Sequence, residues 1–100
     1  MGILEDAALA AGETKVERFN RLLPDFGNSI INDSLCAGFK IVVNDDDLNT
    51  IIFDGKALKA GGKLQEVHRE IGRRYLEFMH SCGITDEDFE KSSGSISWEI

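Results

Sequence analysis

The feature that most limits the fold is a run of apolar residues at helical spacing between positions 63 and 81. It consists of Leu64, Val67, Ile71, Tyr75, Phe78 and Met79. This spacing predicts a long amphipathic helix, because it gathers the six side chains on one face. Glu70 and Arg74 add an i,i+4 ion pair in the favourable order, and Gly83 follows as a C-cap. The rest of the chain must therefore supply a layer that covers this face.

Two segments ahead of the long helix alternate or cluster apolar residues as strands do. Phe39, Ile41 and Val43 alternate with less apolar neighbours, and residues 51–53 form a second short apolar run. The acidic stretch 44–47 lies between them, so we expect a β-hairpin with a long loop. Asp54 and Gly55 then indicate a tight type I′ turn, which leads into a short third strand over 56–59 at a charged edge.

The C-terminal segment also alternates. Ile96, Trp98 and Ile100 are separated by Ser97 and Glu99. This pattern predicts a final strand whose apolar side faces inward. The same three residues are candidates for pairing with a second copy of the chain across a two-fold axis.

Further helices are predicted before and after these strands in the chain, and we expect the helices to pack on one face of the sheet. An alanine-rich helix is expected over 3–11, ending at Gly12. Thr14 and Glu17 form a capping box for a second helix, in which Pro24 either causes a kink or begins a further short helix. Thr85 is expected to cap a helical turn over 86–90.

Together these elements predict an α+β domain spanning residues 1–100. It has N-terminal helices and a small, mainly antiparallel sheet of three or four strands, packed by one long amphipathic helix over 63–81. Its size and its apolar fraction of 42% are ordinary for one domain.

Charge narrows the choice of partners. The net charge is −7 and the isoelectric point is near 4.7, so the chain is repelled by nucleic acid and by anionic membranes. We expect no direct nucleic-acid or membrane contact, and attraction to a basic protein; the alternative is that the charge serves solubility alone. The acidic N-terminal residues do not resemble a signal peptide, and the two cysteines indicate a reducing, cytoplasmic location.

Two clusters concentrate the acidity and are the candidate partner-binding residues. They are Asp45, Asp46 and Asp47 in the expected hairpin loop, and Asp86, Glu87, Asp88 and Glu90 near the C-terminus. A calcium loop of the EF-hand type needs glycine and glutamate where this chain has Thr50 and Lys56, so we predict no metal there. A solvated loop explains the first cluster equally well, and the helix dipole explains the second.

No residues form a recognisable catalytic pattern. His68 and His80 do not share a helix face, and neither Cys36 nor Cys82 lies in a nucleophile signature. Arg69, Arg73 and Arg74 alternate with glutamates, which is typical of a salt-bridged solvent face. We therefore predict no catalytic residue, no cofactor and no enzymatic activity.

Three classes of function fit the sequence, in order of preference. The first is a non-enzymatic interaction module, such as a small inhibitor or immunity-type protein that binds a basic partner. A phage or bacterial accessory protein that blocks a nucleic-acid enzyme belongs to this class, because carboxylates can imitate phosphates. The second is a self-assembling structural or assembly subunit that uses its C-terminal strand as a homo-oligomer contact. The third is a small enzyme.

Overall fold

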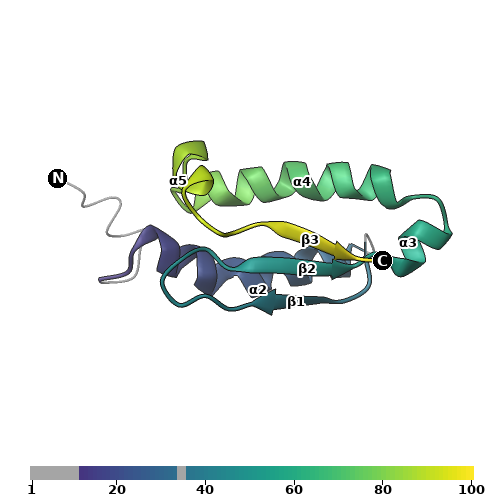
Figure 1. Cartoon of the computed structure of the whole chain (residues 1–100), viewed down its shortest axis with the longest axis horizontal. Coiled ribbons are helices and arrows are strands. Elements are labelled where there is room, and N and C mark those ends of the chain that lie inside the picture. The colour runs from purple at the N-terminus through teal and green to yellow at the C-terminus, as the bar shows by residue number, and fades with distance from the viewer. Residues whose placement is uncertain (1–11, 34–35) are drawn as a thin grey trace.

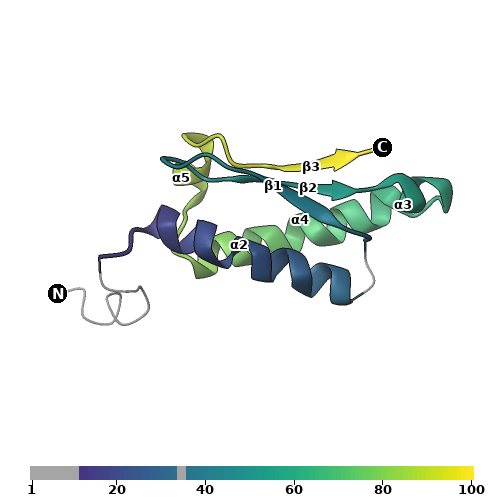
Figure 2. The same ribbon diagram turned by 90° about the horizontal axis from the view of Figure 1, so that it is seen from below.

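The computed structural model describes residues 12–33 and 36–100, and these form an α+β fold. The elements, in chain order, are α2 (Lys15–Asn32), β1 (Phe39–Val42), β2 (Thr50–Asp54), α3 (Lys56–Ala60), α4 (Leu64–Ser81), α5 (Asp86–Glu90) and β3 (Ile96–Glu99). Figures 1 and 2 show the strands as one layer, with α2 and α4 together on one face of it. The helix predicted over 3–11 lies outside the described residues.

The sheet has the order β1-β2-β3 and is mixed. β1 and β2 form the predicted antiparallel hairpin, with Phe39 opposite Phe53. β3 instead runs parallel to β2, with Phe53 opposite Trp98. Parallel neighbours require a crossover connection, and the segment containing α4 provides it. The prediction of a mainly antiparallel sheet was therefore only partly right.

Two long helices, rather than the one predicted, cover the sheet. α2 buries Phe19, Leu23, Gly27 and Ile30, which recur at helical spacing. α4 buries Ile71, Tyr75 and Met79. The core lies between these two faces and the inward side of the strands, where Ile51 and Phe53 are fully buried.

The helix starts follow the local sequence signals. The side chains of Thr14 and Glu17 form the predicted capping box of α2, and Thr85 with Asp88 forms a second one at α5. α2 continues through Pro24 as one helix, so no second helix begins there. Because Leu23 and Gly27 are both buried, packing on either side of the proline offsets its missing hydrogen bond.

The strand and tight turn predicted after Asp54 were wrong. Gly55 has a φ of −100°, outside the positive range that a type I′ turn needs, and residues 56–60 form the helix α3. Oδ1 of Asp54 accepts a hydrogen bond of 3.0 Å from the backbone N–H of Lys56, which starts the helical turn. Alanine, leucine and lysine then favour a helix over a strand.

Candidate functional site

The two predicted acidic clusters lie at the same end of the molecule. The loop between β1 and β2 reaches the segment that follows α5 (Figure 1). Oδ2 of Asp47 accepts hydrogen bonds from the backbone N–H and the hydroxyl of Ser93, at 3.0 and 3.1 Å. Nδ2 of Asn44 donates a third, of 3.0 Å, to the Ser93 hydroxyl. These contacts join segments that are more than 40 residues apart into one acidic end, comprising Asp45, Asp46, Asp47, Asp86, Glu87, Asp88 and Glu90.

Two acids of this end have structural roles. Asp88 accepts a hydrogen bond of 2.8 Å from Nζ of Lys15, and another from the backbone N–H of Thr85. The Lys15 contact is the main reason that the pKa of Asp88 is lowered to about 2. Asp47 accepts from the backbone N–H of Leu48, and this bond is the main cause of its lowered pKa. Both carboxylates therefore hold the fold together at this end.

Two more acids of this end form exposed pairs with neighbouring bases. Oδ1 of Asp86 lies 3.0 Å from Nε2 of His80 at the end of α4. Glu87 accepts a hydrogen bond of 3.0 Å from Nζ of Lys91, one turn further along the chain. Exposed pairs of this kind contribute little to stability, so they can open without disturbing the fold.

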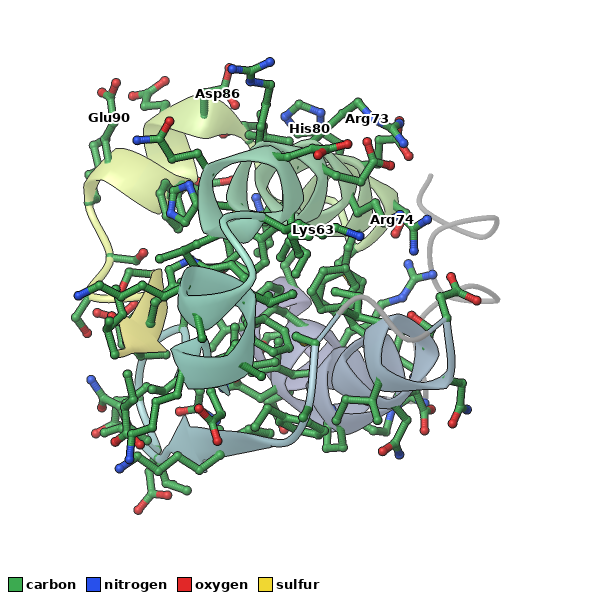
Figure 3. All side chains as sticks on the ribbon, turned by 90° about the vertical axis from the view of Figure 1, so that its right-hand side faces the viewer. Lys63, Arg73, Arg74, His80, Asp86 and Glu90 are labelled. Carbon is green, nitrogen blue, oxygen red and sulfur yellow. The ribbon has the colours of Figure 1, made fainter. Side chains whose placement is uncertain are left out.

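The remaining three acids are exposed and have no ion pair with any described residue. They are Asp45, Asp46 and Glu90. Figure 3 shows Glu90 and Asp86 projecting from α5 away from the body of the molecule. The acidic end therefore combines fixed carboxylates with three whose charge no described side chain neutralises.

A second feature, which we did not predict, is a groove between α4 and β3. One part has a volume of about 570 Å³ and is lined by Leu64, Gln65, His68, Arg69, Trp98 and Ile100. The adjoining part, of about 250 Å³, shares His68 and extends past Gly72, Tyr75 and Leu76 to Phe89. Neither part has an acidic side chain in its lining. The only sequence signal for this groove was that Gly72 and Leu76 lie beside the buried stripe of α4.

Two polar atoms are buried at this groove without a hydrogen-bond partner among the described residues. They are the hydroxyl of Tyr75 and Nε1 of Trp98. Tyr75 is only 4% exposed, and burial raises the pKa of its phenol. The indole of Trp98 is held between Phe53 and His68, with ring centroids 5.5 and 5.2 Å away. The groove is thus apolar, with a few polar groups at its walls.

The residues predicted for the oligomer strand lie beside this groove. Ile96 and Trp98 line it and are partly buried against the core, whereas Ile100 is 56% exposed. β3 pairs with β2 on one side only, and so forms an edge of the sheet.

The basic residues of α4 form a salt-bridged surface, as the sequence indicated. Arg73 pairs with Glu70 and, at 2.6 Å, with Glu77. Arg74 reaches Asp33, the C-cap residue of α2, at 2.8 Å. Figure 3 shows Arg73 and His80 on the side of α4 turned away from the sheet. Arg73 and Arg74, two of the three arginines on this helix, are thus paired with acids within the fold.

The cysteines are poor nucleophiles in this fold. Cys36 and Cys82 are free thiols and both are buried. Burial raises the pKa of Cys36 to about 11 and is also the main cause of the raised pKa of Cys82. Because the thiolate is the reactive form, both are held unreactive near neutral pH.

The described part of the chain contains neither a cluster of metal ligands nor a membrane-spanning helix. Within residues 12–33 and 36–100, no three His, Cys, Asp or Glu side chains come together so as to hold a metal ion. None of the described helices is long and apolar enough to cross a membrane. Comparison with protein families, curated proteins and solved structures finds no match to this chain.

Proposed function

We propose that this protein is a non-enzymatic interaction module that binds a basic partner through its acidic end. The observation that carries the proposal is the meeting of the two acidic clusters through Ser93, Asp47 and Asn44. Carboxylates gathered on one surface create a negative potential, which raises both the rate and the specificity of association with a positive surface.

Within the acidic end, Asp45, Asp46 and Glu90 would make the direct contacts. They are exposed and have no ion pair with a described residue, so binding would break no internal interaction. Asp47 and Asp88 would instead hold the loop and α5 in place, because both are hydrogen-bonded within the fold. A partly rigid surface of this kind loses little conformational freedom on binding.

The kind of partner that we propose rests on the sign and chemistry of the exposed charges. A protein that binds nucleic acid presents lysine and arginine side chains arranged for phosphates. Carboxylates from the loop and from α5 would occupy such phosphate sites. The module would then act as an inhibitor or immunity-type protein. A small phage or bacterial accessory protein that blocks a nucleic-acid enzyme is one example of this class.

The proposal that the module is not an enzyme rests on the chemistry of its cavities. The groove along β3 has His68 and Arg69 in its lining but no acidic side chain to act as an acid or base. The two thiols are buried and protonated. The groove therefore lacks the pairing of acid, base or nucleophile that such catalysis uses. A smaller cavity is lined by Asp47 and Asp88, but both carboxylates are already hydrogen-bonded within the fold.

The test compares two variants with equal charge changes. The first carries Asp45→Asn, Asp46→Asn and Glu90→Gln, and the control carries Asp25→Asn, Glu66→Gln and Glu77→Gln. The three control positions are exposed and lie outside the acidic end, and of them only Glu77 has an ion pair with a described residue, an exposed one with Arg73. Each immobilised protein captures partners from a native lysate at low salt, followed by elution in a salt gradient. We expect a basic protein that the wild type and the control retain and that elutes from the first variant at lower salt.

Two results would contradict the proposal. Equal retention by both variants would show that the acidic end does not make the contact. Retention that is indifferent to ionic strength would show that charge does not drive the binding, because contacts between exposed charges weaken as salt rises.

A further inference from the structure

The outer edge of β3 offers unpaired backbone groups. The carbonyls of Ser95 and Glu99 accept hydrogen bonds from the backbone N–H groups of Ile51 and Gly55, at 3.0 and 2.8 Å. Backbone polar groups alternate in direction along a strand, so the N–H and C=O of Ile96 and Trp98 point away from β2. No described backbone group pairs with them.

Two devices that block strand pairing, a proline and an inward-pointing charge, are absent from this short edge strand. β3 contains no proline, and its groove side carries Ile96 and Trp98 rather than a charge. Beside it, the groove exposes Leu76 to 47% and Ile100 to 56%. A strand added here would gain backbone hydrogen bonds and would cover apolar side chains at the same time.

The helices next to the two ends of β3 differ in the sign of their charge, and this difference selects the occupant. The strand starts next to α5, because Phe89 lines the same cavity as Ser95 and Ile96. It ends next to α3, because Glu99 bonds to Gly55, the residue that precedes α3. α5 is acidic, whereas α3 carries Lys56 and Lys59, which have no ion pair with a described residue.

We propose that β3 pairs antiparallel with β3 of a second copy of this chain across a two-fold axis. Antiparallel pairing places the acidic α5 of each copy beside the basic α3 of its partner, whereas parallel pairing would bring like charges together. The two sheets become continuous, and the grooves face each other so that Leu76 and Ile100 are covered. The contact is isologous, with the same surface used on both copies.

The first test measures mass against concentration for the full chain by analytical ultracentrifugation. Leu76→Glu places a charge in the groove, and Val42→Glu is the matched control, because Val42 is 50% exposed on the other edge strand, β1. We expect a monomer–dimer equilibrium whose dissociation constant rises about tenfold or more in Leu76→Glu, the effect of losing a buried contact at an interface. Val42→Glu should dimerise as the wild type does.

The second test reports on the strand pairing itself. Amide hydrogen exchange should slow at Ile96 and Trp98 as the concentration rises through the dimer range. The N–H groups of Ser97 and Glu99 point toward β2 and should be protected at every concentration. A dimer in which Ile96 and Trp98 exchange as fast as in the monomer would overturn the proposal.

The third test uses charge reversal. Lys59→Glu alone and Glu90→Lys alone should each weaken the dimer, because each substitution puts like charges together at both ends of the two-fold contact. An equimolar mixture should form heterodimers more tightly than either variant self-associates, since opposite charges then meet at both ends. A monomer at all concentrations, or a mixture that associates no better than its components, would refute the inference.

Discussion

The two long helices differ at their central glycines, although each is 18 residues long. A Cβ on Gly27 of α2 would lie 2.6 Å from the ring of Phe39, closer than atoms can approach. A Cβ on Gly72 of α4 would meet no atom within 4 Å. α2 is thus closed against the sheet at this point, whereas α4 has an open flank.

The difference shows that the same amphipathic pattern can serve two purposes. The apolar face of α2 is filled by the sheet, with Phe39 of β1 packed where a side chain on Gly27 would be. α4 lies beside an edge strand, and part of its apolar surface, including Leu76, faces the groove instead. A helix whose apolar surface exceeds what its own core covers marks a surface for contact with another chain.

The largest expected effect separates a core residue of α2 from a groove residue of α4. Phe19 is fully buried, and its ring centroid lies 5.1 Å from that of Phe78. Phe19→Ala should lower the free energy of unfolding by about 3–5 kcal/mol. Leu76→Ala should lower it by less than about 1 kcal/mol. Chemical denaturation at low protein concentration measures both, and similar losses would erase the distinction between the helices.

The next effect concerns Gly27. Alanine normally stabilises a helix by about 1 kcal/mol relative to glycine, but here its methyl group would collide with Phe39. We expect Gly27→Ala to be destabilising by about 1 kcal/mol or more, because overpacking outweighs helix propensity. Adding Phe39→Leu, which shortens the opposing side chain, should recover part of the loss. A more stable Gly27→Ala variant would show that α2 is not closed there.

Gly72 should respond in the opposite direction. Gly72→Ala places a methyl group in open space and should raise the free energy of unfolding of the monomer by about 0.5–1 kcal/mol. Thermal or chemical denaturation of the monomer gives the value. A loss of stability would mean that the flank of α4 is filled.

The smallest expected effect concerns the ion pair between Lys15 and Asp88, which joins the start of α2 to α5. Folding lowers the pKa of Asp88 to about 2, first through Lys15. Its ionised form therefore stabilises the fold above the unfolded pKa of about 3.9, and this contribution disappears as the pH falls toward 2. In Asp88→Asn, the free energy of unfolding should therefore depend less steeply on pH in the acid range than in the wild type. Asp45→Asn is the control for the loss of one exposed carboxyl group. An equal dependence of the free energy of unfolding on acid pH in the wild type and in Asp88→Asn would contradict this stabilising role of the Asp88 carboxylate.

Elements with strong local signals could be predicted from the sequence. The stripe of α4, the capping box at Thr14, the cap at Thr85, and the hairpin of β1 and β2 each depend on residues close together in the chain. α3 was mistaken for a strand because Lys56 to Ala60 is too short for its apolar spacing to separate a helix from a strand.

Features that depend on distant contacts could not be predicted. Whether β3 pairs parallel or antiparallel depends on where the crossover through α4 returns the chain, and local alternation contains no such information. The meeting of the acidic clusters depends on Ser93 and Asp47, which are 46 residues apart. The groove exists because α4 extends beside an edge strand, and the sequence of α4 alone shows only that Gly72 and Leu76 border its stripe.

The position of β3 also has a consequence for how the chain folds during its synthesis. Thr50 and Ser95, neighbours across the two strands, are separated by 45 residues. The hairpin of β1 and β2 can form early, but β2 remains an uncovered edge until residues 96–99 have been made. Folding should therefore be completed late and be limited by this non-local pairing. A nascent chain that stalls before β3 would expose the edge of β2 to other chains.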